Sequence, residues 1–218
     1  MTEIRNPVTL PPDLQKVVDA KISSPAFTHS SWSDEDLTPV RSFIRQHYRT
    51  EQRGRCAYCQ RILGKASPLN CHVDHLLPKA LYQHFLFEPK NLCTVCAECN
   101  TLKRSQETAH EVVNTLNKKQ AKQYPRTSGA FKIVHPHFDS YKEHIEILRN
   151  KFYVPKTKKG YFTVTICDLN AHLREFGWKP EFVDEDSARK AAQRLVNAKS
   201  SHDTAEAIRE LQDALLEL

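Results

Sequence analysis

The 218-residue chain has no long hydrophobic stretch, no internal repeat and no low-complexity tract. No apolar run approaches the roughly 20 residues that cross a bilayer, so the sequence predicts no membrane-spanning helix. The first residues, Met1-Thr-Glu-Ile-Arg, lack the hydrophobic region of a signal peptide. With 39% hydrophobic and 27% charged residues, the composition is typical of a globular protein. We therefore expect a cytoplasmic location.

Disulfide bonds are not expected, because the 7 cysteines are odd in number and several have the spacing of metal ligands. Two Cys-x-x-Cys pairs are present, Cys56 with Cys59 and Cys96 with Cys99. Together they offer four thiolates, which complete the tetrahedral shell of a structural zinc ion. Two cysteines without paired spacing are predicted to be packing residues: Cys71 and Cys167.

The register of the second cysteine pair is open, because Cys93-Thr-Val-Cys96 has the same spacing as the pair that follows it. Spacing alone does not exclude Cys93 as a ligand. We favour Cys96 and Cys99, because the Asn100 and Lys103 that follow them fit the start of a helix beside the site.

Between the two pairs lie polar residues suited to phosphodiester hydrolysis. This reaction needs a base to accept a proton from water, and His75 suits that role because its ordinary pKa is near neutrality. Asp74 and Asn100 offer the oxygen ligands that Mg²⁺ or Mn²⁺ prefers. On an extended strand His72 lies on the same face as Asp74. It is either a further metal ligand, a phosphate contact, or a strand-end histidine hydrogen-bonded to the backbone.

In order and spacing these residues resemble the HNH (ββα-metal) endonuclease superfamily. The matching pattern is Cys56-x-x-Cys59, Val73-Asp74-His75-Leu76-Leu77-Pro78-Lys79, Asn91-Leu92 and Cys96-x-x-Cys99-Asn100-x-x-Lys103. The resemblance implies a metal-dependent nuclease in which Asn91 holds the loop and the imidazole of His75, and Lys103 faces a phosphate. Leu76 and Leu77 replace the aromatic residues usual around the second motif, which leaves the wall of the site undefined.

A narrower resemblance follows in the C-terminal half. The pattern His135-Pro136-His137-Phe138-Asp139, His144-Ile145, Gly160 and Asp168-Leu169-Asn170 is similar to the PtuB-like HNH nucleases of Septu and retron antiphage systems. It implies a PtuA-like ATPase partner and a toxic nuclease held in check until infection. Two alternatives remain, a stand-alone restriction or mobile-element HNH nuclease and a non-catalytic zinc module that binds nucleic acid. DNA and a structured RNA such as tRNA present the same diester, so both stay open as substrates.

The net charge of +6 is a modest basic excess whose placement is informative. Arg41, Arg45 and Arg49 recur every fourth residue and Arg53 continues the row, so on a helix they form one basic stripe. We interpret the stripe as a nucleic-acid contact surface that follows the phosphates, with a solvated helix face as the alternative. Two further basic runs could contact a substrate backbone: Lys118, Lys119, Lys122 and Arg126, and Lys156, Lys158 and Lys159.

The predicted fold class is α+β, with a zinc-stapled ββα-metal HNH core between helical extensions. Residues 1–50 form a helical region with the basic stripe, 51–110 the core, and 111–218 a mainly helical region with one β-hairpin. The expected elements before residue 110 are helices from about 11 to 21 and from near 36 to 54, strands ending at 75 and spanning 91–95, and a helix starting near 97.

In the C-terminal region the hairpin is predicted from residues 151–154 and 161–166, which flank a Lys-rich turn ending at Gly160. Two helices then complete the chain. The last has an apolar stripe made of Ile208, Leu211, Leu215 and Leu218. We expect this stripe to pack against the preceding helix at 188–196, with docking to a partner chain as the alternative.

Overall fold

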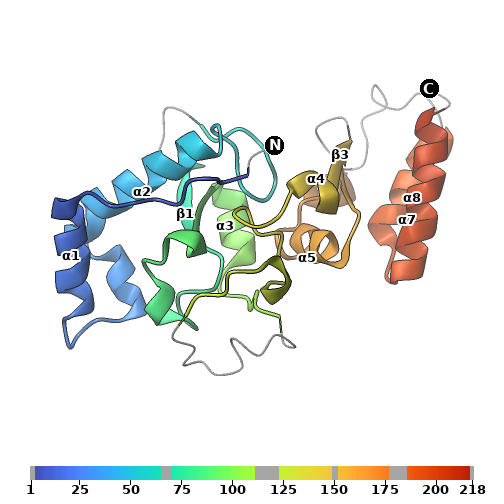
Figure 1. Ribbon diagram of the computed structural model, residues 1–218. Helices are drawn as coiled ribbons and strands as arrows, with labels where there is room; N and C mark the ends of the chain where they lie inside the picture. The colour runs from blue at the N-terminus through green and yellow to red at the C-terminus, as the bar shows by residue number, and fades with distance from the viewer. Residues whose placement is uncertain (1–2, 65–69, 111–122, 149–151, 177–185, 217–218) are drawn as a thin grey trace. The chain divides into compact units, whose positions relative to one another are not determined.

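The structure is a computed structural model in which residues 3–64, 70–110, 123–148, 152–176 and 186–216 are described (Figure 1). The predicted α+β class is confirmed, because helices are combined with two small sheets of two strands each. The chain divides into two compact units, one made of 1–146 with 155–167 and the other of 147–154 with 168–218. The regions 1–50 and 51–110 therefore lie in the same unit.

Helix α1 (Pro12–Ile22) begins with a proline, which is tolerated in the first turn of a helix. Two short 3₁₀ helices, η1 (His29–Ser33) and η2 (Glu35–Leu37), then lead into α2 (Thr38–Glu51). The buried side chains of α2 recur at helical spacing: Val40, Ile44 and Tyr48. They form the apolar face of an amphipathic helix, and α2 packs against the strands that carry the candidate site.

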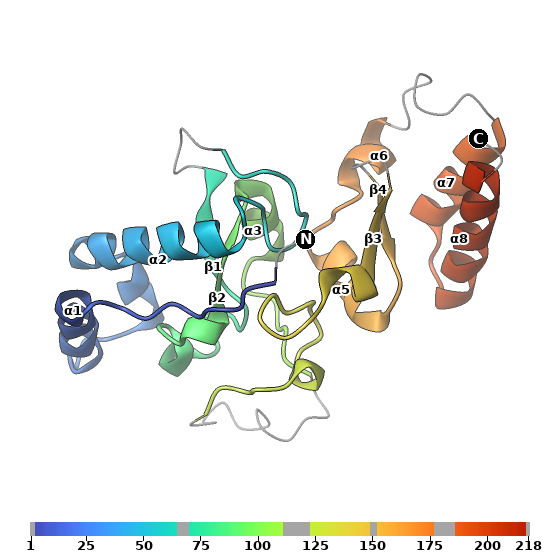
Figure 2. The ribbon, with the colours of Figure 1, turned by 45° about the horizontal axis from the view of Figure 1, so that its top comes forward.

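Strands β1 (His72–His75) and β2 (Leu92–Val95) pair antiparallel, with Asp74 opposite Cys93. Helix α3 (Ala97–Lys103) follows directly and packs against β1 (Figure 2). Between the strands run two more 3₁₀ helices, η4 (Gln83–Phe85) and η5 (Pro89–Asn91). All four residues of β2 are buried. The predicted strands and the start of the third helix are thus found within one or two residues.

The C-terminal hairpin differs from the prediction. Strand β3 (Ile145–Leu148), which follows the single turn α4 (Tyr141–His144), pairs with β4 (Phe152–Pro155). The second predicted strand is instead helix α5 (Lys158–Ile166). Its start is capped by the Thr157 hydroxyl, which accepts a hydrogen bond from the Gly160 amide at 3.1 Å. This cap and the burial of Thr163 override the strand preference of the β-branched residues.

The second unit contains α6 (Ala171–Phe176), α7 (Asp186–Asn197) and α8 (Ser201–Leu216). Helices α7 and α8 lie side by side in both views (Figures 1 and 2). The buried cluster of this unit includes Leu195 and Leu211, with Ile208 packed against it. The predicted packing of the stripe is therefore found for its described part, while the side chains of Leu215 and Leu218 lie outside the described residues.

Among the described residues between α3 and α4 there is one further 3₁₀ helix, η6 (Ser128–Ala130). The predicted basic run at Lys118, Lys119 and Lys122 falls outside the described residues. Across the part of the chain that the structure describes, no helix is both long enough and apolar enough to cross a membrane.

Candidate functional site

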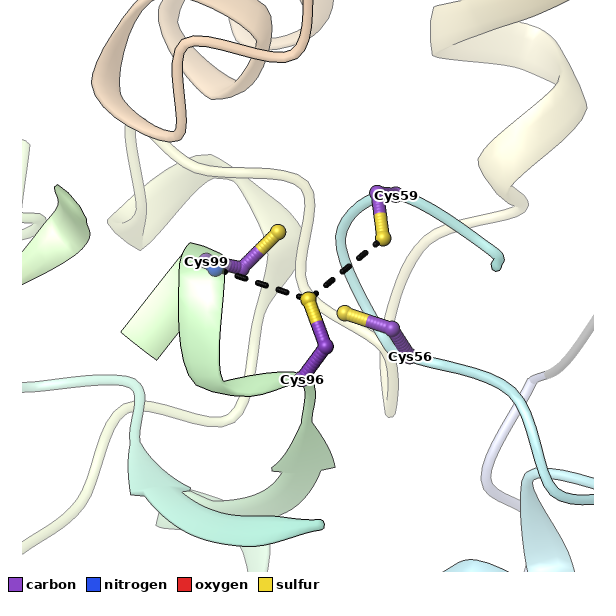
Figure 3. Close-up of side chains that lie close together, drawn as sticks. All are labelled: Cys56, Cys59, Cys96 and Cys99. Atoms are coloured by element: carbon purple, nitrogen blue, oxygen red, sulfur yellow. Dashed lines mark hydrogen bonds between the residues drawn. The ribbon is translucent and has the colours of Figure 1, made fainter. Parts of the chain in front are cut away.

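The two predicted cysteine pairs meet at one point (Figure 3). Cys56 and Cys59 come from the loop after α2, Cys96 caps the start of α3, and Cys99 lies in the first turn of that helix. Their sulfur atoms all lie within 4.8 Å of one another, and all four residues are buried. Hydrogen bonds from neighbouring thiols, that of Cys56 first, hold the pKa of Cys96 far below its ordinary value. Four sulfur donors at this separation can hold a tetrahedral metal ion.

The alternative ligand Cys93 is not part of this group. It lies on β2 opposite Asp74, and burial raises the pKa of its thiol well above the ordinary value. Cys71 and Cys167 are buried outside the group, although the side chain of Cys167 contacts that of Cys99. Among the described residues no other set of three His, Cys, Asp or Glu side chains is close enough to share an ion.

Asp74 lies at the centre of a buried polar network that connects the metal group to the second predicted site. The Tyr58 hydroxyl, from the first cysteine pair, donates to Asp74 Oδ2 at 2.6 Å. Lys103 Nζ lies 3.1 Å from the same oxygen and donates to the carbonyl oxygen of His75 at 2.8 Å. Lys103 is fully buried, so its ammonium group holds the strand end that carries Asp74 and His75. This position differs from the predicted phosphate contact.

The orientation of His75 is set by its ring nitrogen Nε2, which lies 3.0 Å from the carbonyl oxygen of Leu86. A carbonyl only accepts hydrogen bonds, so Nε2 carries the proton and Nδ1 of the neutral ring is a proton acceptor. Burial lowers the pKa of His75 to about 4, which keeps the ring neutral at pH 7. The ring of Trp32 contacts the imidazole edge to face, with 4.6 Å between centroids.

Asn91 is fully buried and closes the loop between the two strands. Its side-chain oxygen accepts from the Leu77 amide at 2.7 Å, and its side-chain nitrogen donates to the carbonyl of Phe85 at 3.0 Å. These hydrogen bonds go to the loop and not to the His75 ring itself. Asn91 therefore fixes the loop next to Leu86, whose carbonyl oxygen receives the His75 proton.

Asp74 and His75 open onto a cavity of about 540 Å³. The predicted ligands His72 and Asn100 also line it, and His72 Nδ1 lies 3.5 Å from the side-chain nitrogen of Asn100. The cationic residues of the lining are Arg41, Arg45, Lys79 and Arg104. The cavity thus combines a neutral histidine, oxygen ligands and several positive charges.

The predicted arginine row divides in the structure. Arg45 lines the cavity, and its Nε is shielded from solvent without a hydrogen-bond partner among the described residues. The guanidinium of Arg41 is engaged by the carbonyl oxygens of Trp32 and Asp34. Arg49 is not among the lining residues. The row ends there, because α2 stops at Glu51 and Arg53 lies in the following turn with a positive φ of 52°.

Arg104 adds a strained residue to the cavity wall. It follows the last residue of α3 with φ of 50° and ψ of −138°, a backbone conformation that non-glycine residues rarely adopt. Such strain persists where the surrounding structure fixes it and is frequent at functional sites. Its Nε donates to the carbonyl of Thr101 at 3.2 Å, which ties the side chain to the helix end beside Asn100.

Sequence reasoning missed Tyr58 and Trp32 as parts of this site. Tyr58 lies inside the motif Cys56-Ala-Tyr-Cys59, where its position between two metal ligands was a usable signal. Trp32 precedes the recognised pattern and carries no motif, so only the fold brings it to His75. A scan against models of protein families finds no match to this chain, and a search of curated proteins finds no similar sequence.

Proposed function

We propose that the protein is a metal-dependent endonuclease of the HNH type that hydrolyses phosphodiester bonds in DNA or in a structured RNA such as tRNA. The observation that carries the proposal is the neutral, buried His75, whose Nε2 is fixed by the carbonyl of Leu86 and which shares a cationic cavity with Asp74 and Asn100. The sequence resemblance supports the same reading.

In this mechanism His75 acts as general base. Its Nδ1 accepts a proton from the water that attacks phosphorus, while Leu86 keeps the other ring nitrogen protonated. Arg45 and Arg104 offset the negative charge of the phosphate. Asp74 and Asn100 would hold Mg²⁺ or Mn²⁺, which supplies charge neutralisation at the phosphate and the leaving oxygen. Tyr58 and Lys103 orient the carboxylate of Asp74 for this role.

The cysteine group suits a structural zinc ion in this proposal, because four thiolates leave no open coordination position for substrate. Zinc would join the loop after α2 to the start of α3, next to Asn100. We expect about one zinc per chain, and Cys56→Ser should lose it together with much of the folded state. Cys93→Ser should keep it. Loss of zinc from Cys93→Ser with retention in Cys99→Ser would show that the register is wrong.

The decisive test of the nuclease is His75→Ala. The variant should lose 10²- to 10⁴-fold or more in cleavage rate, because it removes the proton acceptor, while zinc content and nucleic-acid binding stay near wild type. His84→Ala is the matched control, because His84 is an exposed histidine of the same loop and does not line this cavity. Plasmid DNA and total tRNA, each with Mg²⁺ or Mn²⁺, are the substrates. Equal cleavage by His75→Ala and wild type would refute the mechanism.

The biological setting proposed is a Septu- or retron-type antiphage system with a PtuA-like ATPase as partner. Its support is the sequence pattern from His135 to Asn170. The tagged protein should co-purify with the ATPase encoded beside it, and cleavage should depend on that partner. A protein that purifies alone and is fully active alone would favour the alternative, a stand-alone restriction or mobile-element nuclease. A zinc module without catalysis predicts binding and no cleavage by any preparation.

A further inference from the structure

The segment Thr28–Asp34, which precedes every recognised motif, reaches the cavity of the candidate site. It contains η1 and contributes Trp32 to the cavity lining. Its own fold is fixed locally, because the Thr28 hydroxyl accepts from the Ser30 amide at 3.2 Å and the Thr28 amide donates to the Ser31 hydroxyl at 3.1 Å. The segment is therefore an ordered part of the first unit.

Trp32 restrains the rotation of the His75 ring that its hydrogen bond to the Leu86 carbonyl leaves possible. A single hydrogen bond at Nε2 fixes one ring atom, and the terminal torsion of a histidine side chain has a broad energy profile. The indole ring lies against the imidazole at an interplanar angle of 81° and blocks its rotation. Phe87 also contacts the indole, with 5.8 Å between the two centroids. Hydrogen bond and aromatic contact together define the direction of Nδ1.

Three polar side chains tether this segment and the adjoining Phe27, and they come from α2 and from the loop that follows His75. Arg41 Nη1 donates to the carbonyl oxygens of Trp32 at 2.6 Å and of Asp34 at 2.7 Å. Lys79 Nζ donates to the carbonyl of His29 at 3.2 Å, and the Gln83 side chain bonds the carbonyl of Phe27 at 3.0 Å. Hydrogen bonds from charged donors are about twice as strong as neutral ones.

We propose that Trp32 is a positioning residue for His75, held in place by Arg41 and Lys79, so that the N-terminal segment completes the catalytic centre. The inference rests on the proposed nuclease function. It assigns to Trp32 the aromatic wall that Leu76 and Leu77 do not supply, because both leucines are fully buried in the core. With only 8% of its surface exposed, Trp32 offers no ring face on which a nucleobase could stack. Its effect on the reaction passes through the imidazole.

The test compares single-turnover cleavage at saturating substrate for Trp32→Ala, Trp32→Phe and Arg41→Ala. Trp32→Ala should lose about 10- to 100-fold in rate, since a small misplacement of a reacting group has effects of this size. Affinity for the nucleic acid should change by less than about threefold, as expected for a residue that does not touch it. Trp32→Phe should recover most of the rate, because it keeps an aromatic ring against His75. Gln46→Ala, exposed on the same helix as Arg41, is the control.

Arg41→Ala separates positioning from simple packing, because it leaves the indole in place and removes its tether. The variant also removes one positive charge from the cavity lining, so the rate is compared at saturating substrate. We expect a smaller loss of rate with unchanged zinc content and thermal stability near that of Gln46→Ala. If Trp32→Ala loses its zinc, the test uses Trp32→Leu instead, because leucine fills much of the same volume without a ring. Wild-type rates in a zinc-containing Trp32→Ala or Trp32→Leu protein would overturn the inference while leaving the nuclease intact.

The contact between Trp32 and His75 can also be measured without catalysis, because the chain has only 2 tryptophans. In a Trp178→Phe background the tryptophan fluorescence, excited selectively over that of the tyrosines, comes from Trp32 alone, and adding His75→Ala should change its emission. An unchanged emission would show that the two rings are not in contact, whatever the activity. If the wild-type protein cleaves nothing, the proposed function fails, and this measurement still decides the contact.

Discussion

Lys103 carries a buried charge, and the effect of this charge on stability depends on its partner. Its ammonium group is fully buried and is satisfied by Asp74 and the carbonyl of His75. Taking two charges out of water is unfavourable, and the attraction between them offsets that only while both are present. Removing one partner leaves an uncompensated buried charge. The pair therefore fixes the strand end rather than adding net stability.

Lys103→Met should lower the free energy of unfolding by about 3–5 kcal/mol, because Asp74 then keeps a buried charge without a partner. Adding Asp74→Asn should restore part of that loss, which gives a coupling energy between the two positions. Urea unfolding of the four proteins in the cycle measures it. Lys16→Met, at an exposed position of α1, serves as control. Additive losses in the double variant would show that the two groups do not interact.

His137 belongs to the C-terminal pattern that begins at His135, and its side chain bonds the backbone of β2. Its Nε2 lies 2.9 Å from the Leu92 carbonyl oxygen, which therefore accepts its proton. Its Nδ1 is shielded and has no hydrogen-bond partner among the described residues. Burial lowers the pKa of His137 to about 4. The folded state thus requires a neutral ring, whereas the unfolded chain protonates it near pH 6.5.

The sign of the resulting pH dependence follows from this depressed pKa. The contribution to stability is complete above pH 6.5 and is lost as the pH falls toward 4, because the unfolded state then binds the extra proton. Between pH 7 and pH 5 the wild type should lose about 2 kcal/mol more than His137→Gln, which cannot titrate. Urea unfolding at both pH values measures the difference, and effects of acid on the metal site cancel in the comparison. Equal losses in both proteins would contradict the neutral ring.

At the scale of elements, Gly160 explains why α5 can lie close to the chain before β3. A Cβ at this position would lie 1.9 Å from the carbonyl oxygen of His144, a separation that forces the backbone to move. The sequence places this glycine at the end of a predicted hairpin turn. The structure uses it for a close approach between α5 and α4 instead.

Gly160→Ala should therefore destabilise the protein by about 1–3 kcal/mol through overpacking. Gly129→Ala provides the matched control, because a Cβ at Gly129 meets nothing within 4 Å. That variant should stay within about 0.5 kcal/mol of the wild type. Urea or thermal unfolding of both variants measures the contrast. Two equally stable variants would show that the backbone near His144 yields without strain.

The elements around the candidate site could be predicted from sequence because local signals agree there. Prolines open α1, and cysteine spacing, Asn100 and Lys103 indicate the start of α3. The strand predicted at 161–166 was wrong because its β-branched residues favour strands only when no tertiary contact decides otherwise. Here the Thr163 hydroxyl accepts from the Val134 amide at 2.8 Å, a partner that local sequence does not reveal.

At the scale of the whole molecule, the sequence predicts which residues form the site but not which of them contact one another. The grouping of four cysteines follows from their spacing, and it is the part of the site most accessible to prediction. The pairing of Lys103 with Asp74, the position of Trp32 and the division of the arginine row depend on which residues distant in sequence come together. These contacts separate residues that face the cavity from residues that hold its walls.

The net charge of +6 bears on substrate binding only through the positions of the charges. If Arg45 contacts a phosphate from the cavity wall, Arg45→Ala should weaken binding and reduce the slope of log K against log salt by about 0.9, the value for one phosphate contact on duplex DNA. Cleavage at saturating substrate should fall much less than in His75→Ala.

Arg53→Ala is the control for this prediction. It removes the same charge from the turn beyond α2, away from the row, and should leave the slope nearly unchanged. Binding measured between 50 and 200 mM salt, over which the Debye length falls by about half, tests the contrast. Equal slopes for wild type and Arg45→Ala would remove Arg45 from the nucleic-acid surface.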